Sequence, residues 1–190
     1  MRTAWAVGVI VSIFIFSFPS RLRAQHGAPP IEQMRKLSFL HGRWEGTGTM
    51  SRGPGTEQAA RVVETVQPKL GGAILLVEGV GHTGAPGAAD EKVVHHALGV
   101  ISFDPDTNQY RMRAYRADGR FVDPTIVIED KRIIWTFADP RAGTIRYTIT
   151  INDKGQWHEL GEMSRDGGKT FSPFFEMTLD RKGDAPADGG

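Results

Sequence analysis

The side chains in this sequence that are best suited to exchange protons with a bound molecule are Glu162, Glu176, His96 and Tyr147. A carboxyl group, an imidazole and a phenol can act as general acid and base when they lie within hydrogen-bond reach of the reacting atoms. Chemistry of this kind, as in a cofactor-independent isomerase or cyclase, leaves no linear motif. The linear motifs of serine hydrolases, zinc proteases and phosphate-binding loops are absent, and so is Cys. The sequence therefore keeps an enzyme as an alternative without assigning catalytic residues.

No group of side chains is spaced as a metal site requires. His95 and His96 are adjacent, and adjacent side chains of an extended strand point to opposite faces, so both rings cannot bind one ion. The segment 104–108, Asp-Pro-Asp-Thr-Asn, begins like a calcium-binding loop. Gln109 and Tyr115, however, stand where such a loop needs Gly and Glu. We therefore expect no metal ligands.

Large aromatic side chains concentrate in the second half of the chain. They recur at alternating positions, which places several of them on one face of an extended strand. The set consists of Trp135, Phe137, Tyr147, Trp157, Phe171 and Phe175. Such a set either packs as a solid core or lines a cavity, and an apolar lining with a few polar groups is typical of a small-molecule site. The candidate ligand-binding residues are Trp135, Phe137, Tyr147, Trp157 and Phe175.

Two arginines decide what charge such a ligand would carry. Arg111 and Arg113 share one face of their segment, and Met112 with its apolar neighbours occupies the other. If the arginines point inward, the ligand is an acid. The apolar residues between them favour the outward arrangement, in which the arginines are solvated. Arg113 is kept with the aromatic residues as a candidate ligand contact.

The elements that must position these residues are almost all strands. Apolar residues at 31, 34, 37 and 40 recur at helical spacing and predict one short helix. Ten extended runs follow, separated by turn residues, over 43–51, 57–67, 73–81, 92–103, 109–116, 120–129, 132–137, 144–151, 156–164 and 171–181. Consecutive antiparallel strands bury an apolar face and remove their edges most simply by closing into a barrel, and ten strands leave interior space. A sandwich of two sheets shares the alternation and stays open as an alternative.

Both ends of this region resemble a known family. The stretch 39–48, Phe-Leu-x-Gly-x-Trp-x-Gly-x-Gly, is similar to the first-strand signature of lipocalin-like (calycin) barrels. It looks most like nitrobindin-type barrels and related uncharacterised exported bacterial proteins, and residues 164–181 resemble the end of the same proteins. The resemblance implies an all-β, about ten-stranded antiparallel calycin-like barrel with one short N-terminal helix.

The resemblance also implies roles for single residues. In calycins a first-strand Trp lies across the closed end of the barrel, and an Arg near the end of the last strand stacks on it. Trp44 and Arg181 are the matching positions, and we expect both to be structural. Nitrobindins bind haem through a His in the C-terminal half, but the last two strands here contain only His158. This departure argues against haem, and we expect no cofactor.

The N-terminus has the features of a secretory signal peptide. Arg2 precedes a 15-residue apolar run over 4–18, and Leu22-Arg23-Ala24 offers a cleavage site before Gln25. The run is shorter than the roughly 20 residues of a membrane span, although an uncleaved anchor remains the alternative. Without residues 1–24 the chain carries 20 basic and 22 acidic side chains, a balance that does not favour nucleic acid. The predicted organisation is a signal peptide at 1–24, a flexible leader at 25–30, a barrel domain at 31–182 and a disordered tail at 183–190.

The sequence thus predicts a periplasmic or secreted barrel that holds a small, mostly apolar ligand in its interior. It favours a binding protein over an enzyme, with no membrane span after cleavage and no particular oligomeric state. A cofactor-independent barrel enzyme and an envelope interaction module with a filled core are the alternatives.

Overall fold

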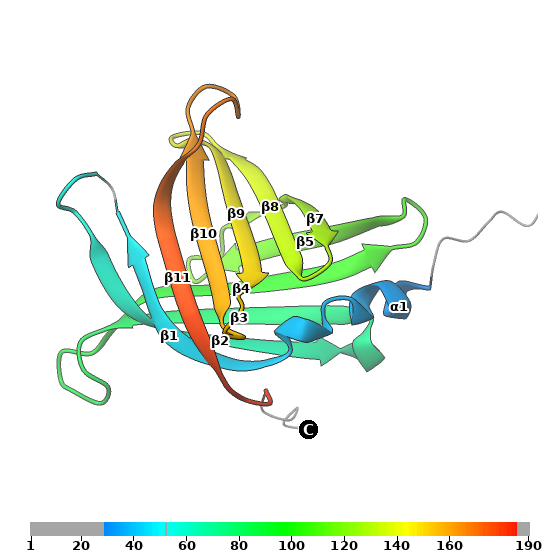
Figure 1. Ribbon diagram of the computed structural model, residues 1–190, viewed down its shortest axis with the longest axis horizontal. Helices are drawn as coiled ribbons and strands as arrows, with labels where there is room; N and C mark the ends of the chain where they lie inside the picture. The colour runs from blue at the N-terminus through cyan, green and yellow to red at the C-terminus, as the bar shows by residue number, and fades with distance from the viewer. Residues whose placement is uncertain (1–28, 52, 186–190) are drawn as a thin grey trace, which may run out of the picture.

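The computed structural model describes residues 29–51 and 53–185 of the chain. They form one antiparallel sheet and a short helix, α1 (Pro30–Arg35), with two 3₁₀ turns, η1 (Ser38–Leu40) and η2 (Leu70–Gly72) (Figure 1). The strands are β1 (Gly42–Met50), β2 (Gln58–Lys69), β3 (Ile74–Thr83), β4 (Lys92–Asp104), β5 (Gln109–Arg116), β6 (Phe121–Val122), β7 (Thr125–Glu129), β8 (Arg132–Asp139), β9 (Gly143–Ile151), β10 (Trp157–Ser164) and β11 (Ser172–Gly183). The expected signal peptide, most of the expected leader and residues 186–190 lie outside the described residues.

The eleven strands of the described residues belong to a single sheet. Their order is β6-β5-β4-β3-β2-β1-β11-β10-β9-β8-β7, so neighbours in the sheet are consecutive in the chain except for β1 and β11. Through this pairing of the first strand with the last, the sheet curls around a concave face (Figure 1). The predicted all-β antiparallel architecture is confirmed. Two details differ from the prediction: the described residues form eleven strands where about ten were expected, and the barrel is open rather than closed.

The opening lies between β6 and β7, which are the two edges of the sheet. The sequence predicted one strand over 120–129. In the structure Phe121–Val122 pairs with β5 and Thr125–Glu129 pairs with β8, so the two halves of this segment join opposite edges. Pro124, between them, has no N–H group to donate and cannot continue a strand that is paired on both sides. We attribute both the extra strand and the open barrel to this break.

Side chains alternate between the concave face and the outer face of the sheet. The register places Trp44 opposite Glu64 and Trp135 opposite Tyr147, so that each pair shares a face. As the alternation in the sequence predicts, the bulky side chains of β8 and β9 stand on the same face as each other. These side chains point into the concave interior.

Phe171 does not share the face of Phe175, contrary to the spacing of four residues between them. The register of β10 and β11 shifts here: Phe175 lies opposite Gly161, whereas the next residue of β10 lies opposite Pro173. Such a bulge places an extra residue on β11 and inverts the alternation beyond it. The Phe171 ring therefore lies on the outer face, where the Arg146 guanidinium is 3.7 Å from its centroid.

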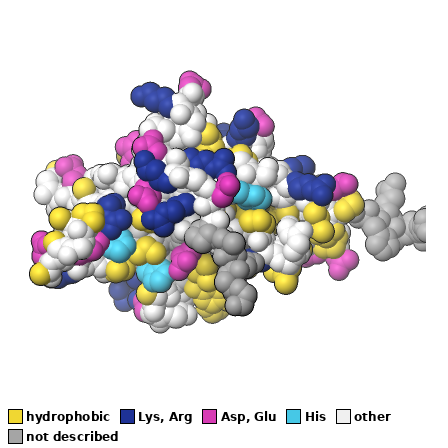
Figure 2. Space-filling view, turned by 90° about the horizontal axis from the view of Figure 1, so that it is seen from below, with side chains coloured by type: hydrophobic (Ala, Val, Ile, Leu, Met, Phe, Trp, Pro, Cys, Tyr) yellow, Lys and Arg dark blue, Asp and Glu magenta, His cyan; other side chains and the backbone are white. Residues whose placement is uncertain are grey.

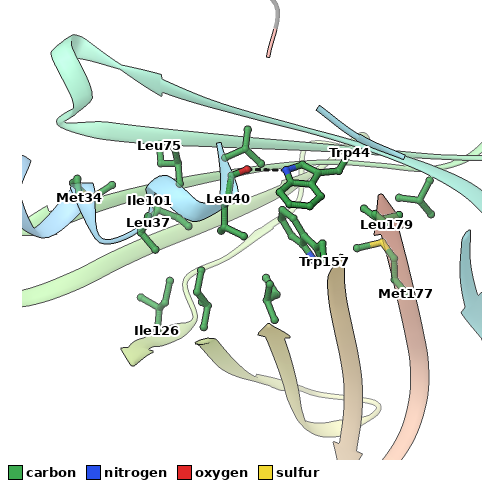
Figure 3. Close-up of a cluster of buried hydrophobic side chains, with 14 of the residues drawn as sticks. Met34, Leu37, Leu40, Trp44, Leu75, Ile101, Ile126, Trp157, Met177 and Leu179 are labelled. Atoms are coloured by element: carbon green, nitrogen blue, oxygen red, sulfur yellow. Dashed lines mark hydrogen bonds between the residues drawn. The ribbon is translucent and has the colours of Figure 1, made fainter. Parts of the chain in front are cut away.

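One end of the barrel is closed by the N-terminal helical segment. The apolar side chains of this segment pack on core residues from both halves of the sheet, and the cluster includes Met34, Leu37, Leu40, Leu75, Ile101, Ile126 and Leu179 (Figure 3). The helix predicted over 31–40 is shorter than expected, because α1 ends at Arg35 and η1 continues the same apolar face. The Tyr110 hydroxyl donates a hydrogen bond of 2.8 Å to the Gln33 carbonyl oxygen and so attaches α1 to β5.

Trp44 stands at the centre of this closed end and is 2% exposed. Its Nε1 donates a hydrogen bond of 2.8 Å to the Leu40 carbonyl oxygen, and its ring meets that of Trp157 edge-on, with 5.8 Å between centroids (Figure 3). The Arg181 guanidinium lies 5.9 Å from the Trp44 ring centroid, and its Nη2 donates to the His41 carbonyl oxygen at 2.8 Å. The last strand is thereby tied to the helical segment through Trp44 and Arg181.

The outer face of the sheet carries ion pairs between neighbouring strands. Arg146 and Glu162 approach to 2.8 Å, and His158 and Glu176 to 2.9 Å, between nitrogen and oxygen. On the face seen in Figure 2, Lys and Arg side chains lie next to Asp and Glu side chains. Among the helices of residues 29–51 and 53–185, none has the length and apolar character of a membrane span.

Candidate functional site

Four aromatic side chains from three strands stand together on the concave face. We call Trp135, Phe137, Tyr147 and Phe175 the aromatic wall. The rings of Trp135 and Tyr147 are stacked, with 4.2 Å between centroids and 11° between planes. Phe137 continues this stack 5.7 Å from Trp135, and Phe175 meets Tyr147 edge-on at 6.0 Å. All four side chains are half-buried, so part of each remains accessible on the concave face.

A glycine makes this arrangement possible. Gly161 on β10 lies opposite both Tyr147 on β9 and Phe175 on β11. A Cβ atom at this position would be 2.7 Å from Tyr147 Cε1 and 2.9 Å from Phe175 Cβ, closer than Cβ atoms approach other atoms. The two rings therefore use space above Gly161 that any other residue would occupy.

A buried carboxyl group lies next to the aromatic wall. Glu159 occupies the inward position of β10 between Trp157 and Gly161, and it is 8% exposed. Trp157 Nε1 donates a hydrogen bond of 3.3 Å to Glu159 Oε2. Burial raises the pKa of Glu159 to about 7, and the hydrogen bond from Trp157 opposes part of this rise. Burial and the negative charge of Glu159 also raise the pKa of the Tyr147 hydroxyl.

A second carboxyl group, that of Glu64, lies close enough to Glu159 for their charges to interact. Glu64 stands opposite Trp44 on β1 and opposite Gly79 on β3. Burial raises the pKa of Glu64 to about 8, with further contributions from the negative charges of Glu159 and Glu78. A Cβ atom on Gly79 would be 2.8 Å from Glu64 Oε2 and nearer still to Oε1. Glycine at position 79 therefore makes room for the carboxyl group.

Neither interior carboxyl group has a positively charged partner among the described residues. The charges acting on Glu64 are negative, and the group acting on Glu159 is the N–H donor of Trp157. A desolvated carboxylate without a cation is costly, and two such groups within reach of each other do not both ionise easily. Near neutral pH the pair therefore retains part of its protons, and it can both donate and accept hydrogen bonds.

Of the acid–base candidates named from the sequence, Tyr147 alone lies on the concave face. Glu162, Glu176 and His96 lie on the outer face, each within 2.9 Å of a basic or acidic partner. Each follows or precedes an inward residue on its strand, and alternation therefore directs it outward. These three residues do not contribute to the interior.

Sequence reasoning missed Glu64 and Glu159, although the sequence carries a signal for both. Glu159 alternates with Trp157 and Gly161, and Glu64 lies two residues from a valine on either side. Charged side chains are almost never buried without a partner. An acidic residue at an inward position of a barrel strand is therefore a candidate for function, and this criterion would have found both.

Arg113 does not reach the interior. It lies opposite Val100 on the outer face, where its Nε donates to Asp123 Oδ1 at 2.6 Å and its guanidinium covers the Phe121 ring at 4.3 Å. Arg111 points the same way, two residues earlier on β5. The structure therefore has the outward arrangement that the apolar neighbours favoured, and these two arginines offer no partner to an acidic ligand in the interior.

A groove of about 940 Å³ runs along the seam between β5 and β7. Met112 and Ile126 from the concave side line it together with Arg113 and Asp123 from the outer side. Residues of both faces contribute because the sheet is not hydrogen-bonded across this seam.

The curled antiparallel sheet, the helical segment at one end and the pairing of the first strand with the last allow a comparison with solved structures. The fold is similar to that of Rv2717c from M. tuberculosis. The TM-score is 0.55 over 82% of this chain and 99% of that chain, at 14% sequence identity. At this identity the similarity shows the fold alone. No protein family and no curated protein matches the sequence.

The residue considered for haem does not lie in the interior. His158 points to the outer face, where its Nε2 is 2.9 Å from Glu176 Oε1. Within residues 29–51 and 53–185, no three His, Cys, Asp or Glu side chains gather as a metal site requires. The interior offers apolar rings, the Tyr147 hydroxyl and two carboxyl groups.

Proposed function

We propose that this chain is an exported, calycin-like barrel whose concave interior binds a small, mostly apolar molecule. The aromatic wall carries the proposal, because it is a half-buried apolar surface inside a curled sheet. Surfaces of this kind, with a few polar groups, are typical of small-molecule sites. The signature-like stretch 39–48 and the contact of Trp44 with Arg181 support the calycin-like assignment.

A neutral, environment-sensitive dye such as Nile red is expected to bind with a Kd on the order of micromolar and to quench tryptophan emission. Trp135→Ala should weaken this binding at least about fivefold, because it removes one half of the stacked pair. Phe171→Ala is the matched control, since it removes a ring from the outer face of the same half of the barrel. Its affinity for the dye should equal that of the wild type, and circular dichroism should show both variants folded.

The opposite outcome would be informative as well. If a panel of dyes and lipids, fatty acids included, shows no binding to the folded protein, the interior does not accept ligands. The role of an envelope interaction module with a filled core would then replace the one proposed.

A cofactor-independent enzyme is the second candidate, and one observation favours it. With pKa values of about 7 for Glu159 and about 8 for Glu64, both protonation states are accessible near neutral pH. This is the property that a general acid–base catalyst needs. Turnover of any bound ligand that disappears in Glu159→Gln, with binding retained, would distinguish an enzyme from a binding protein.

Export is part of the proposal and has its own test. The segment 1–24 has a basic start, an apolar run and a small-residue cleavage site. Intact mass measurement of protein recovered from the periplasm or the medium should give a chain that begins at Gln25. Recovery of chains that still begin at Met1 would contradict cleavage at this position.

A further inference from the structure

We infer that the ligand of the interior carries a cationic, hydrogen-bond-donating group, such as an amine, that lies between Glu64 and Glu159 while its apolar part contacts the aromatic wall. This assignment rests on the proposed function, because it names the chemistry of the molecule that the interior would bind. It starts from an imbalance of charge: the interior holds two carboxyl groups, and no described residue brings a positive charge to either.

Three of the four carboxyl oxygens also lack a hydrogen-bond donor among the described residues. Glu159 is 8% exposed, and among the described residues its donor is Trp157 Nε1, which contacts Oε2 and leaves Oε1 free. No described residue donates to the Glu64 carboxyl group. A desolvated carboxyl group without a partner is costly, and these oxygens are not sealed off, so a donor that the chain itself does not supply can reach them. An ammonium group supplies up to three N–H donors and a charge of the required sign.

The outer face of the same sheet shows the contrast. Glu78, Glu162 and Glu176 each lie within 2.9 Å of a His or Arg nitrogen. These acidic residues have partners although solvent already stabilises their charge. Glu64 and Glu159, which solvent stabilises far less, have none among the described residues. A general shortage of basic side chains therefore does not explain why the two interior carboxyl groups have no basic partner.

The aromatic wall reinforces a preference for cations. The next inward residue after Glu159 on β10 is Gly161, and above it stand the rings of Tyr147 and Phe175. A cation in contact with Glu159 is therefore beside aromatic rings, which attract cations through their quadrupole. The stacked rings of Trp135 and Tyr147 offer a planar surface to the apolar part of the same molecule.

Other charged occupants fit the interior less well. An anion would add a third acidic group beside Glu64 and Glu159, and Arg111 and Arg113 point away from it. Hard divalent cations take six or more oxygen ligands, whereas the described residues hold no cluster of three acidic, His or Cys side chains. An organic cation with an apolar body matches both the carboxyl pair and the rings.

Three naphthalenes of nearly equal size test this inference: 1-naphthylmethylamine, 1-naphthylmethanol and 1-naphthoate. Their affinities for the purified protein can be measured by isothermal titration calorimetry near neutral pH. The amine is expected to bind at least about tenfold more tightly than the acid, with the alcohol in between. Glu64→Gln and Glu159→Gln should each reduce the preference to about threefold or less. Glu176→Gln, which makes the same change in net charge on the outer face, should keep it.

The outcomes separate this inference from the proposed function. If the alcohol binds and the amine is no tighter than the acid, the interior has no charge preference and the inference is overturned, while the proposed function stands. Tightest binding of the acid would also overturn it. If none of the three binds although Nile red does, the inference is overturned and the proposed function stands; if Nile red and the lipid panel fail to bind as well, both are overturned. The wild-type comparison requires no variant, so a glutamine variant that does not fold leaves the test intact.

Discussion

Replacing Trp44 by alanine should lower the free energy of unfolding by about 3–5 kcal/mol, the range for losing a large buried aromatic side chain. Trp44 is 2% exposed and packs between Trp157 and the helical segment. Its removal leaves a cavity at the closed end of the barrel and takes the hydrogen-bond donor from the Leu40 carbonyl oxygen. Chemical denaturation followed by far-ultraviolet circular dichroism measures the loss without relying on the deleted indole.

Two further variants separate the sources of this loss. Trp44→Phe keeps most of the buried ring but leaves the Leu40 carbonyl oxygen unpaired, which should cost about 1–3 kcal/mol. Arg181→Ala removes an exposed guanidinium near the Trp44 ring and a hydrogen bond to His41, and should cost about 1 kcal/mol or less. A denaturation midpoint for Trp44→Ala equal to that of the wild type would show that Trp44 does not support the closed end.

Glu64→Gln should become progressively more stable than the wild type as the pH rises from about 5 to about 8. In this range the folded wild type keeps a proton on Glu64, whose pKa is raised to about 8, while the unfolded chain has released it. Unfolding then releases a proton, so the free energy of unfolding of the wild type falls with rising pH. The difference from the uncharged glutamine variant should grow by roughly 1 kcal/mol per pH unit. Glu159→Gln should gain stability over the wild type in the same way up to pH 7, the approximate pKa of Glu159.

Comparison with each variant isolates this effect from other titrating groups. His41 and His95 have pKa values below the ordinary range because both are partly buried and lie near positive charges, and they act in the opposite direction. They are present in all variants and cancel in the difference. Glu176→Gln, on the outer face, is the control: its stability relative to the wild type should not rise with pH in this way. A difference between Glu64→Gln and the wild type that stays constant from pH 5 to pH 8 would show that Glu64 ionises freely in the folded protein.

The architecture could be predicted from the sequence wherever the position of a residue depends only on the alternation within its own strand. Alternating apolar residues directed Trp135 and Tyr147 to one face, and the register confirms that they lie opposite each other. The prediction failed where geometry depends on two strands at once. Pro124 was recognised as an interruption, but the sequence does not reveal that the two halves of its segment pair with different neighbours. The bulge before Phe175, which turns Phe171 outward, is likewise a property of a strand pair.

The candidate site divides in the same way. Four of the five aromatic candidates lie together in the aromatic wall, because large apolar side chains at alternating positions mark an inward face. The fifth, Trp157, is 1% exposed and packs on Trp44 in the core. The interior carboxyl groups were missed, because their closeness depends on the curl that brings β2 and β10 to face each other across the interior. Glu64 and Glu159 are 95 residues apart in the sequence, and neither belongs to a motif. Their interaction follows from the strand order and the curl of the sheet.

The place of β11 in the sheet has a consequence for folding. The last strand of the chain lies inside the sheet, between β1 and β10 (Figure 1). Until it is in place, β1 to β6 and β7 to β10 can form only as two separate meanders of local hairpins. Closure between β1 and β11 spans more than a hundred residues, and contacts of such long range form slowly because the loop between them must first be ordered. The two half-sheets should therefore assemble early, with the inner edges of β1 and β10 unprotected, and β11 should join them in the final step.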